Sequence, residues 1–203
     1  MSLPIPTAYL PPIAYITETL RFDEILWEAF ETYSKQTYRN HCSILGPNGR
    51  QTLSVPVIKV NGNHTLIRDI RISYQQPWQK IHWRSIEAAY ANAPFFIYYR
   101  DSFHPYYLKP FPFLLDFNQG LTEVILAAIK VDQPIKRTTS FIGYRNSPDI
   151  EKIISKKSRF HNPEYRQVFH ERSVFLPNLS IIDCLFNLGP ETFSYLNQCS
   201  HLR

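Results

Sequence analysis

The feature that most constrains the fold is a turn motif, Asn48-Gly49, between two stretches of strand-forming residues, 41–45 and 51–57. An Asn-Gly pair readily adopts the positive backbone φ angles that a tight hairpin turn needs. Pro56 lacks a backbone N–H and therefore predicts an edge position or a bulge near the end of the second strand. The motif predicts an antiparallel β-hairpin in this part of the chain.

Other stretches show the periodicities of strands and helices. Residues 65–73 end in alternating apolar and charged side chains and predict a third strand, which extends the hairpin into an antiparallel meander over 41–73. Residues 23–33 fit a helix by composition and a strand by alternation, and we favour the strand. Further short strands are predicted at 4–12, 138–144 and 167–171. Apolar side chains at helical spacing predict helices at 13–22, 78–93, 113–129, 179–188 and 191–197.

Strands and helices follow one another in mixed order, without an internal repeat or a linker. The sequence therefore predicts a mixed α and β fold (α/β or α+β), in which helices cover a sheet that includes the 41–73 meander. With 203 residues, we expect residues 1–203 to form a single domain.

The positive charge of the chain is concentrated in one segment. The net charge is +5, and residues 130–172 contain ten Lys and Arg against five Asp and Glu. Such a segment favours an anionic partner, although a solvated loop is the alternative. Residues 147–163 are poorly patterned and indicate a loop with some helix, so we expect the basic segment at 146–172 to be mobile or to lie on the surface. No nucleic-acid-binding motif accompanies the charge, and we do not expect nucleic acid as the partner.

Several classes of protein are excluded by what the sequence lacks. No apolar stretch approaches the roughly 18 residues of a membrane-spanning helix, and the first residues do not resemble a signal peptide. Cys42, Cys184 and Cys199 have neither the number nor the spacing of a disulfide framework or a zinc site, so we expect free thiols and a cytoplasmic protein. Glycine-rich phosphate loops and hydrolase motifs are absent as well, so the sequence assigns no cofactor and no metal.

The densest polar cluster, residues 33–41, lies directly before the hairpin. Its phenol, amine, amide and guanidinium groups are suited to holding an anionic, hydroxyl-rich ligand. The candidate substrate-binding residues of this cluster are Lys35, Tyr38, Arg39 and Asn40. The alternative is a polar turn that caps the hairpin.

Two further side chains are candidate general bases. His82 lies on a predicted helix and Asp183 lies within an apolar run. Either could deprotonate an acceptor, whereas a packed core histidine and a structural carboxylate are the alternatives. A buried carboxylate needs a partner, and Arg39 is the cation that we consider for Asp183. We expect Arg39 to be at least half buried, within reach of a carboxylate or of an open polar cleft.

Aromatic side chains supply a third kind of candidate. Tyr9 and Trp83, together with Phe96, are expected to stack on a sugar or a base. Convergence of Lys35, Arg39, His82 and Asp183 in one pocket would favour an enzyme, and scattered positions would favour a binding protein.

Four stretches, in this order along the chain, resemble the WbqC-like protein family. They are residues 7–15 (TAYLPPIAY), residues 35–57 with KQTYRN at 35–40, residues 78–96 with HW at 82–83 and APFF at 93–96, and residues 179–189 (LSIIDCLFNLG). The resemblance implies a bacterial protein of surface polysaccharide (O-antigen) production. It also implies a transferase-type reaction on an activated sugar or sugar-nucleotide, such as aminoacyl (glycine) transfer, but it assigns no catalytic residue. A glycan-binding or partner-binding module of the same pathway is the alternative.

The chain departs from the family pattern at two places. His41 stands where the pattern usually has a second arginine, and the segment 146–172 lacks a Gly- and Tyr-containing stretch of longer members. These departures put the identity of the ligand in doubt, and the basic run is a candidate replacement for the missing stretch.

Overall fold

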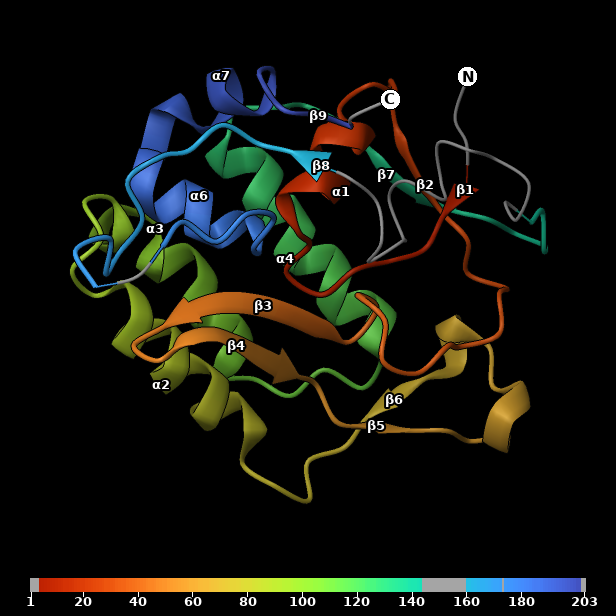
Figure 1. Cartoon of the computed structure of the whole chain (residues 1–203). Helices are drawn as coiled ribbons and strands as arrows, with labels where there is room; N and C mark the ends of the chain where they lie inside the picture. The colour runs from red at the N-terminus through yellow and green to blue at the C-terminus, as the bar shows by residue number, and fades with distance from the viewer. Residues whose placement is uncertain (1–3, 144–159, 173, 202–203) are drawn as a thin grey trace.

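The structure of the protein is a computed structural model, which describes residues 4–143, 160–172 and 174–201. A three-stranded parallel sheet in the order β1-β2-β7 forms one side of the molecule (Figure 1). Its strands are β1 (Pro4–Ile5), β2 (Ile25–Trp27) and β7 (Ile135–Arg137). The helix α1 (Ile13–Thr19) crosses over between β1 and β2, as parallel neighbours require. The mixed α and β fold class is confirmed.

The predicted hairpin is confirmed, with β3 (His41–Gly46) and β4 (Gly49–Ser54) paired antiparallel. Gly49 has a φ of 97°, which is the left-handed conformation that the turn motif was expected to supply. One face of β3 packs against α2 (Trp78–Tyr90) and α6 (Ile181–Leu188). The hairpin is therefore fixed to the helical side of the molecule.

The predicted third strand of the meander is wrong. Residues 62–64 and 67–69 form the 3-10 turns η1 (Gly62–His64) and η2 (Ile67–Asp69), and within the predicted range only β6 (Arg71–Ile72) forms a strand. β6 pairs with β5 (Val57–Ile58) in a separate two-stranded ladder. Pro56 cannot donate to a ladder and separates β4 from β5. Ile67 and Ile70 are both buried at a spacing of three, which suits a turn and not a strand.

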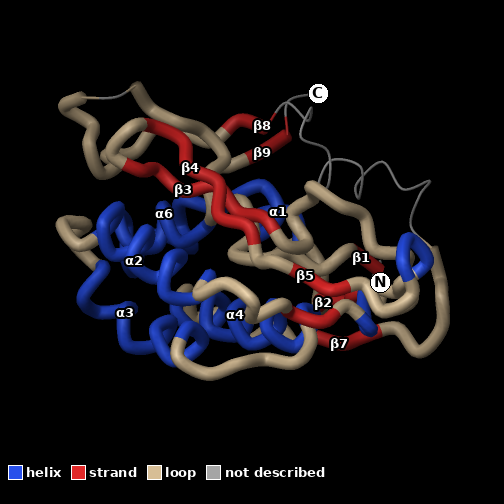
Figure 2. Tube along the Cα trace, turned by 90° about the horizontal axis from the view of Figure 1, so that it is seen from below, coloured by secondary structure: helices blue, strands red, loops and turns tan. Residues whose placement is uncertain are grey.

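The helices match the sequence predictions closely. α2, α4 (Leu114–Ala128), α6 and α7 (Thr192–Leu196) lie within or next to the expected ranges, and α3 (Phe96–Phe103) with η3 (His104–Tyr107) follows Pro94. Figure 2 shows α2, α3, α4 and α6 grouped together, with the parallel sheet beyond them. α4 packs against α3, α6, η2 and η3, so its apolar stripe lies at the centre of the core. The short elements η4 (Gly189–Glu191), β8 (Phe160–His161) and β9 (Ser200–His201) complete the described chain.

Two other strand predictions are wrong as well. The strand near residue 138 is observed three residues earlier, as β7, and residues 138–143 form bends and irregular structure. At 167–171 the chain turns: the His170 N–H donates to the Gln167 carbonyl, the Arg172 N–H donates to the Phe169 carbonyl, and Phe169 has a φ of 61°. Of the expected strand at 4–12 only β1 forms a ladder, because prolines interrupt the rest.

The cysteines and the basic segment were the subject of two further expectations. Cys42, Cys184 and Cys199 are free, as predicted, and all three are buried. The basic segment at 146–172 and the loop predicted at 147–163 lie largely outside the described residues, which resume at 160. Among the helices that the structure describes, none has the length and apolar character needed to cross a bilayer.

Candidate functional site

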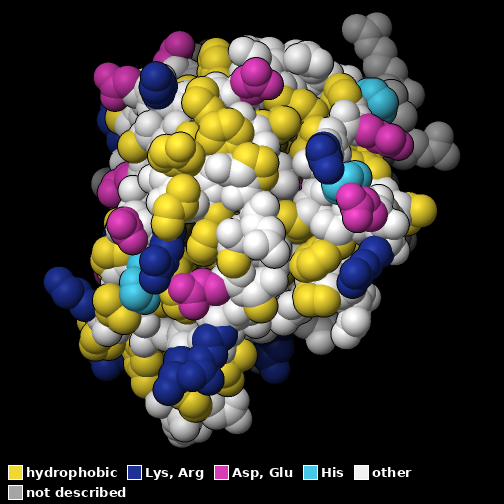
Figure 3. Space-filling model, turned by 90° about the vertical axis from the view of Figure 1, so that its left-hand side faces the viewer, with side chains coloured by type: hydrophobic (Ala, Val, Ile, Leu, Met, Phe, Trp, Pro, Cys, Tyr) yellow, Lys and Arg dark blue, Asp and Glu magenta, His cyan; other side chains and the backbone are white. Residues whose placement is uncertain are grey.

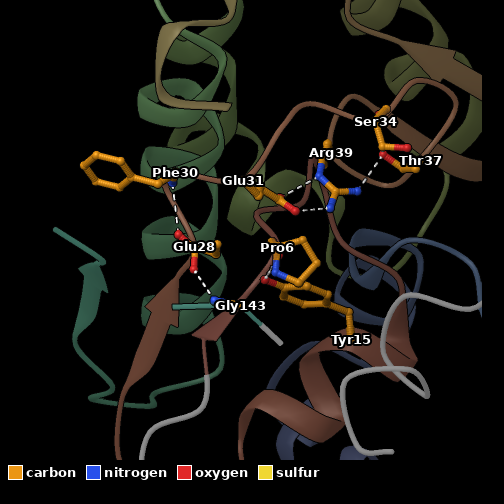
Figure 4. A network of polar contacts seen from close by, with 9 residues as sticks. All are labelled: Pro6, Tyr15, Glu28, Phe30, Glu31, Ser34, Thr37, Arg39 and Gly143. Atoms are coloured by element: carbon orange, nitrogen blue, oxygen red, sulfur yellow. Dashed lines mark hydrogen bonds and ion pairs between the residues drawn. The ribbon is translucent and has the colours of Figure 1, made fainter. Parts of the chain in front are cut away.

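Arg39 lies in the loop between β2 and β3 and is buried against Glu31 (Figure 4). Its Nε donates to Glu31 Oε1 at 2.7 Å and its Nη2 to Glu31 Oε2 at 2.5 Å, so the guanidinium holds the carboxylate by two hydrogen bonds. Its Nη1 donates to Thr37 Oγ1 at 3.1 Å. The expectation that Arg39 is buried beside a carboxylate is confirmed. The expected partner Asp183 is wrong, and no sequence signal pointed to Glu31.

A second carboxylate, Glu28, lies near Glu31 at the carboxyl end of β2 (Figure 4). It accepts hydrogen bonds from Thr138 Oγ1 and from the N–H groups of Phe30, Ile142 and Gly143. Burial by itself raises the pKa of Glu28, but these hydrogen bonds together lower it below its ordinary value. Glu28 therefore ties the chain that follows β7 to the end of β2.

The other candidates of the polar cluster have different surroundings. Lys35 is exposed beside Lys59, whose pKa is lowered by desolvation and then by the charge of Lys35. Tyr38 is half buried. Asn40 is buried, and its Nδ2 donates to the Val55 carbonyl at 2.9 Å. Asn40 thus fixes the base of the hairpin, which is the alternative that the sequence left open.

His82 belongs to a buried network of aromatic residues. Its Nδ1 is 2.9 Å from the Tyr9 hydroxyl, which in turn is 2.9 Å from the Tyr107 hydroxyl. Burial lowers the pKa of His82 to about 4, although a hydrogen bond to the Ser54 backbone opposes the shift. Trp83 is buried and stacks on His104, with ring centroids 4.5 Å apart. In this arrangement the Tyr9 hydroxyl and His82 Nδ1 form a hydrogen bond with each other.

Asp183 is fully buried in the first turn of α6. Its described hydrogen-bond partners carry no charge, although the charge of Arg50 also acts to lower its pKa. The Tyr90 hydroxyl donates to Oδ1 at 2.9 Å, while the Tyr165 hydroxyl and Gln167 Nε2 (3.0 Å) donate to Oδ2. Burial raises the pKa of Asp183, and the three hydrogen bonds oppose that shift without cancelling it. A carboxylate held by neutral donors is the unusual feature of this region.

Neither of the two cavities described below is lined by Lys35, Arg39, His82 or Asp183. Arg39, His82 and Asp183 are held by three different sets of partners, and Lys35 is exposed elsewhere. Their roles as catalytic and substrate-binding residues stay predictions.

Asp183 and its partners Tyr90, Tyr165 and Gln167 form what we call the Asp183 cluster. A cavity of about 590 Å³ lies next to this cluster, and we call it the α6 cavity. One wall is the loop 166–172, and the other comes from the ends of α2 and α6 and the turn after α2. The lining residues are Ala89, Asn92, Pro94, residues 166–172, Asn187 and Leu188. Gln167 belongs both to this wall and to the Asp183 cluster, so Asp183 lies one side chain behind the cavity.

The loop wall of the α6 cavity carries several charged side chains, which the sequence predicted only as part of a longer basic segment. Arg166, His170 and Arg172 line the cavity with a single carboxylate, Glu171. They form the described end of the basic segment, and the charge count was the signal that pointed to them. On the face in Figure 3, charged and histidine side chains form separate small groups between hydrophobic ones, with no continuous basic stripe.

A sequence model of the WbqC-like protein family matches residues 7–161 and 151–195 of the chain. The chain belongs to the WbqC-like protein family. Uncharacterized protein Rv1507c of Mycobacterium tuberculosis is 27% identical over 229 residues, covering 94% of this chain and 92% of that protein. No solved structure matches this WbqC-like protein.

The family stretches and the α6 cavity coincide in part. Ala89 and Pro94 come from the third stretch that resembles the family, and Asn187 and Leu188 come from the fourth. The loop 166–172 also lies within the residues that the family model matches, so the whole lining of the α6 cavity belongs to the matched part of the chain.

Proposed function

We propose that this WbqC-like protein binds a phosphate-bearing sugar, such as a sugar-nucleotide, in the α6 cavity, and that it serves bacterial surface polysaccharide production. The observation that carries the proposal is the composition of the loop wall, where two guanidinium groups and an imidazole surround the cavity with one carboxylate. The family membership supports the sugar, and the charge of the loop supports the phosphate.

The loop wall keeps hydrogen-bonding groups for a ligand. Arg166 Nε donates to His170 Nε2 at 3.0 Å, and His170 Nε2 is also 4.0 Å from Glu171 Oε1. The terminal nitrogens of the Arg166 guanidinium are not part of that contact, and among the described residues Arg172 has no acidic partner. A planar guanidinium can hold a phosphate by two hydrogen bonds, which makes arginine the usual residue for this purpose. Asn92 is exposed on the opposite wall, and its amide can both donate to and accept from sugar hydroxyls.

Asp183 supports the loop wall from behind. Gln167 Nε2 donates to Asp183 Oδ2 and to the Leu176 carbonyl at 3.0 Å, and Gln167 Oε1 accepts from the Leu176 N–H at 2.9 Å. The amide is therefore fixed in position on both sides. In this proposal Asp183 positions the wall and does not touch the ligand.

Glycosyl transfer is the second candidate, and His170 favours it because its imidazole lines the cavity. In that reaction the bond between the sugar C1 and the phosphate oxygen breaks, and a bond forms between C1 and an acceptor hydroxyl. Arg166 Nε donates to His170 Nε2 in this structure, so the acceptor hydroxyl must first replace that donor. The imidazole then accepts the hydroxyl proton, and the nucleoside diphosphate leaves.

Calorimetric titration of the full chain with uridine diphosphate glucose and guanosine diphosphate mannose tests the binding. We expect Arg166→Ala combined with Arg172→Ala to weaken binding by about tenfold or more, which corresponds to roughly 1.4 kcal/mol or more. Arg84→Ala is the matched control, because Arg84 is an exposed arginine of α2 outside the α6 cavity. Binding should also weaken as salt increases, because the contacts are ionic.

Two results would overturn the proposal. One is the absence of binding by either sugar-nucleotide at millimolar concentration, and the other is equal affinity in the double variant and in Arg84→Ala. Competition by inorganic phosphate alone, without a contribution from the sugar, would reduce the site to a phosphate site. For the second candidate, His170→Gln should keep the affinity and abolish release of nucleoside diphosphate in the presence of acceptor sugars.

A further inference from the structure

A second cavity, of about 500 Å³, lies beside α4 and shares no lining residue with the α6 cavity. We call it the α4 cavity. Its lining combines the aromatic rings of Tyr106 and Phe111 with polar side chains of α4 and of β7. None of its residues was a candidate in the sequence, and the proposed function does not use them.

The aromatic part of the cavity is held rigidly. The rings of Tyr106 and Phe111 are stacked nearly parallel, at 8° and with centroids 5.5 Å apart. Gln79 Nε2 donates to the carbonyls of Tyr106 (3.2 Å) and Lys109 (2.8 Å). The Tyr74 hydroxyl donates to the Phe111 carbonyl at 3.0 Å and accepts from its N–H at 2.7 Å. The segment 106–111 is thus fixed at both ends by side chains from outside it.

Gly120 allows Tyr106 to lie directly on α4. A Cβ at this position would be 2.3 Å from Tyr106 Cε1 and 2.8 Å from the Tyr106 hydroxyl oxygen. Any other residue would therefore displace the ring. Glycine within a helix is unfavourable by about 1 kcal/mol relative to alanine, so the close approach of the ring is the structural reason for it here.

The polar part of the cavity is electrically balanced. Arg137 Nη2 is 2.8 Å from Asp116 Oδ1, and Arg137 also donates to Gln119 Oε1. Gln119 Nε2 donates to Glu123 Oε1 at 2.8 Å. With Lys109, the cavity has two cations and two carboxylates. This balance gives no preference for an anion, in contrast to the α6 cavity.

Several side chains of the α4 cavity have hydrogen-bonding groups that a ligand could use. Among the described residues, the Tyr106 hydroxyl and Lys109 Nζ have no hydrogen-bond partner, and Glu123 Oε2 is not used by Gln119. A saturated sugar ring has an apolar C–H face and a rim of hydroxyls that both donate and accept. Aromatic rings suit the face, and carboxylate, amide and ammonium groups suit the rim. We infer that the α4 cavity binds a neutral sugar ring with free hydroxyls.

Saturation-transfer NMR on the full chain tests this inference with methyl glycosides as probes. The panel contains the gluco, galacto, manno, 6-deoxy and 2-acetamido forms, with adenosine as a neutral aromatic competitor. We expect saturation transfer to at least one glycoside. The signal should weaken by about fivefold or more in Tyr106→Ala and by less in Tyr106→Phe, because the phenylalanine keeps the ring and loses only the hydroxyl.

A second variant and a control keep the result interpretable. Glu123 is exposed, so Glu123→Gln should fold normally and weaken binding by about threefold through loss of a charged acceptor. Tyr98→Ala removes an exposed ring of α3 outside both cavities and should change nothing. No transfer to any glycoside, equal transfer in Tyr106→Ala and wild type, or binding of adenosine alone would overturn the inference. Loss of binding in the Arg166 and Arg172 double variant would instead assign the glycoside to the α6 cavity.

Discussion

The loop after β2 and the first turn of α6 each bury a carboxylate, but they balance it in opposite ways. Glu31 is held by the guanidinium of Arg39, which supplies a full positive charge. Asp183 is held by two phenols and an amide, which supply hydrogen bonds without a formal charge. The first arrangement pairs two opposite charges in a buried place. The second leaves a carboxylate whose pKa is raised by burial, one side chain behind a cavity.

The largest expected effect comes from breaking the ion pair between Arg39 and Glu31. Arg39→Met leaves Glu31 buried without its countercharge, which should lower the free energy of unfolding by about 3–5 kcal/mol. Urea denaturation measures it. In Arg39→Lys the charge remains and the two-pronged contact is lost, so the decrease should be smaller.

Two further variants serve as controls for this prediction. Arg68→Met breaks an exposed pair with Asp69 at 3.6 Å and a contact of the guanidinium with the Phe30 ring, and it should cost about 1 kcal/mol. The double variant Glu31→Leu with Arg39→Met removes both charges and should recover most of the lost stability. A single variant no less stable than Arg68→Met would show that the buried pair contributes little.

The dependence of stability on pH tests a third buried group, the imidazole of His82. The pKa of His82 is about 4 in the folded protein and near 6.5 in an unfolded chain, so the unfolded chain binds more protons between these values. Stability should therefore fall by about 3 kcal/mol as the pH drops from 6.5 to 4. His82→Gln should abolish this part of the pH dependence, measured by urea denaturation across the range.

Asp183 should respond in the opposite sense. Its pKa is raised in the folded state, so its contribution to stability is complete below the unfolded pKa and is lost as the pH rises through the folded pKa. Asp183→Asn should remove that loss. Identical pH profiles for Asp183→Asn and wild type would mean that the carboxylate has the same pKa in both states.

The smallest expected effect comes from weakening the neutral cluster by one donor. Tyr165→Phe removes one hydrogen bond to Asp183 and should lower the free energy of unfolding by about 2 kcal/mol. It should also raise the pKa of Asp183 further, because that hydrogen bond opposes the shift. Tyr98→Phe, at a side chain 74% exposed, is the control and should leave stability unchanged.

Local signals in the sequence were sufficient for the hairpin and the long helices. The Asn48-Gly49 turn and the apolar stripe of α4 depend on neighbours close in sequence, so the pattern predicts them directly. The parallel sheet was not predictable in the same way, because β1 and β2 contain two and three residues and pair across a crossover. The meander prediction failed because it assumed that β4 continues past Pro56 into the same sheet.

The candidate site was predictable only in its types of residue. Burial of Arg39 beside a carboxylate followed from its chemistry, but the choice of Glu31 over Asp183 depends on how the loop folds. The phenols around Asp183 come from positions 90 and 165, which are brought together only by tertiary packing. The charge count indicated the whole segment 130–172, and only the fold shows that its last residues, 166–172, form a loop that lines a cavity with the end of α6.

The three buried thiols can report local opening of three separate parts of this protein. Cys42 lies in β3, Cys184 in α6 and Cys199 just after α7, and burial raises the pKa of each thiol. Because an alkylating reagent attacks the thiolate, each cysteine reacts only when its own surroundings open. The labelling rate at each position, measured by mass spectrometry, therefore reports how often the hairpin, the wall of the α6 cavity and the C-terminal region open separately, without any engineered probe.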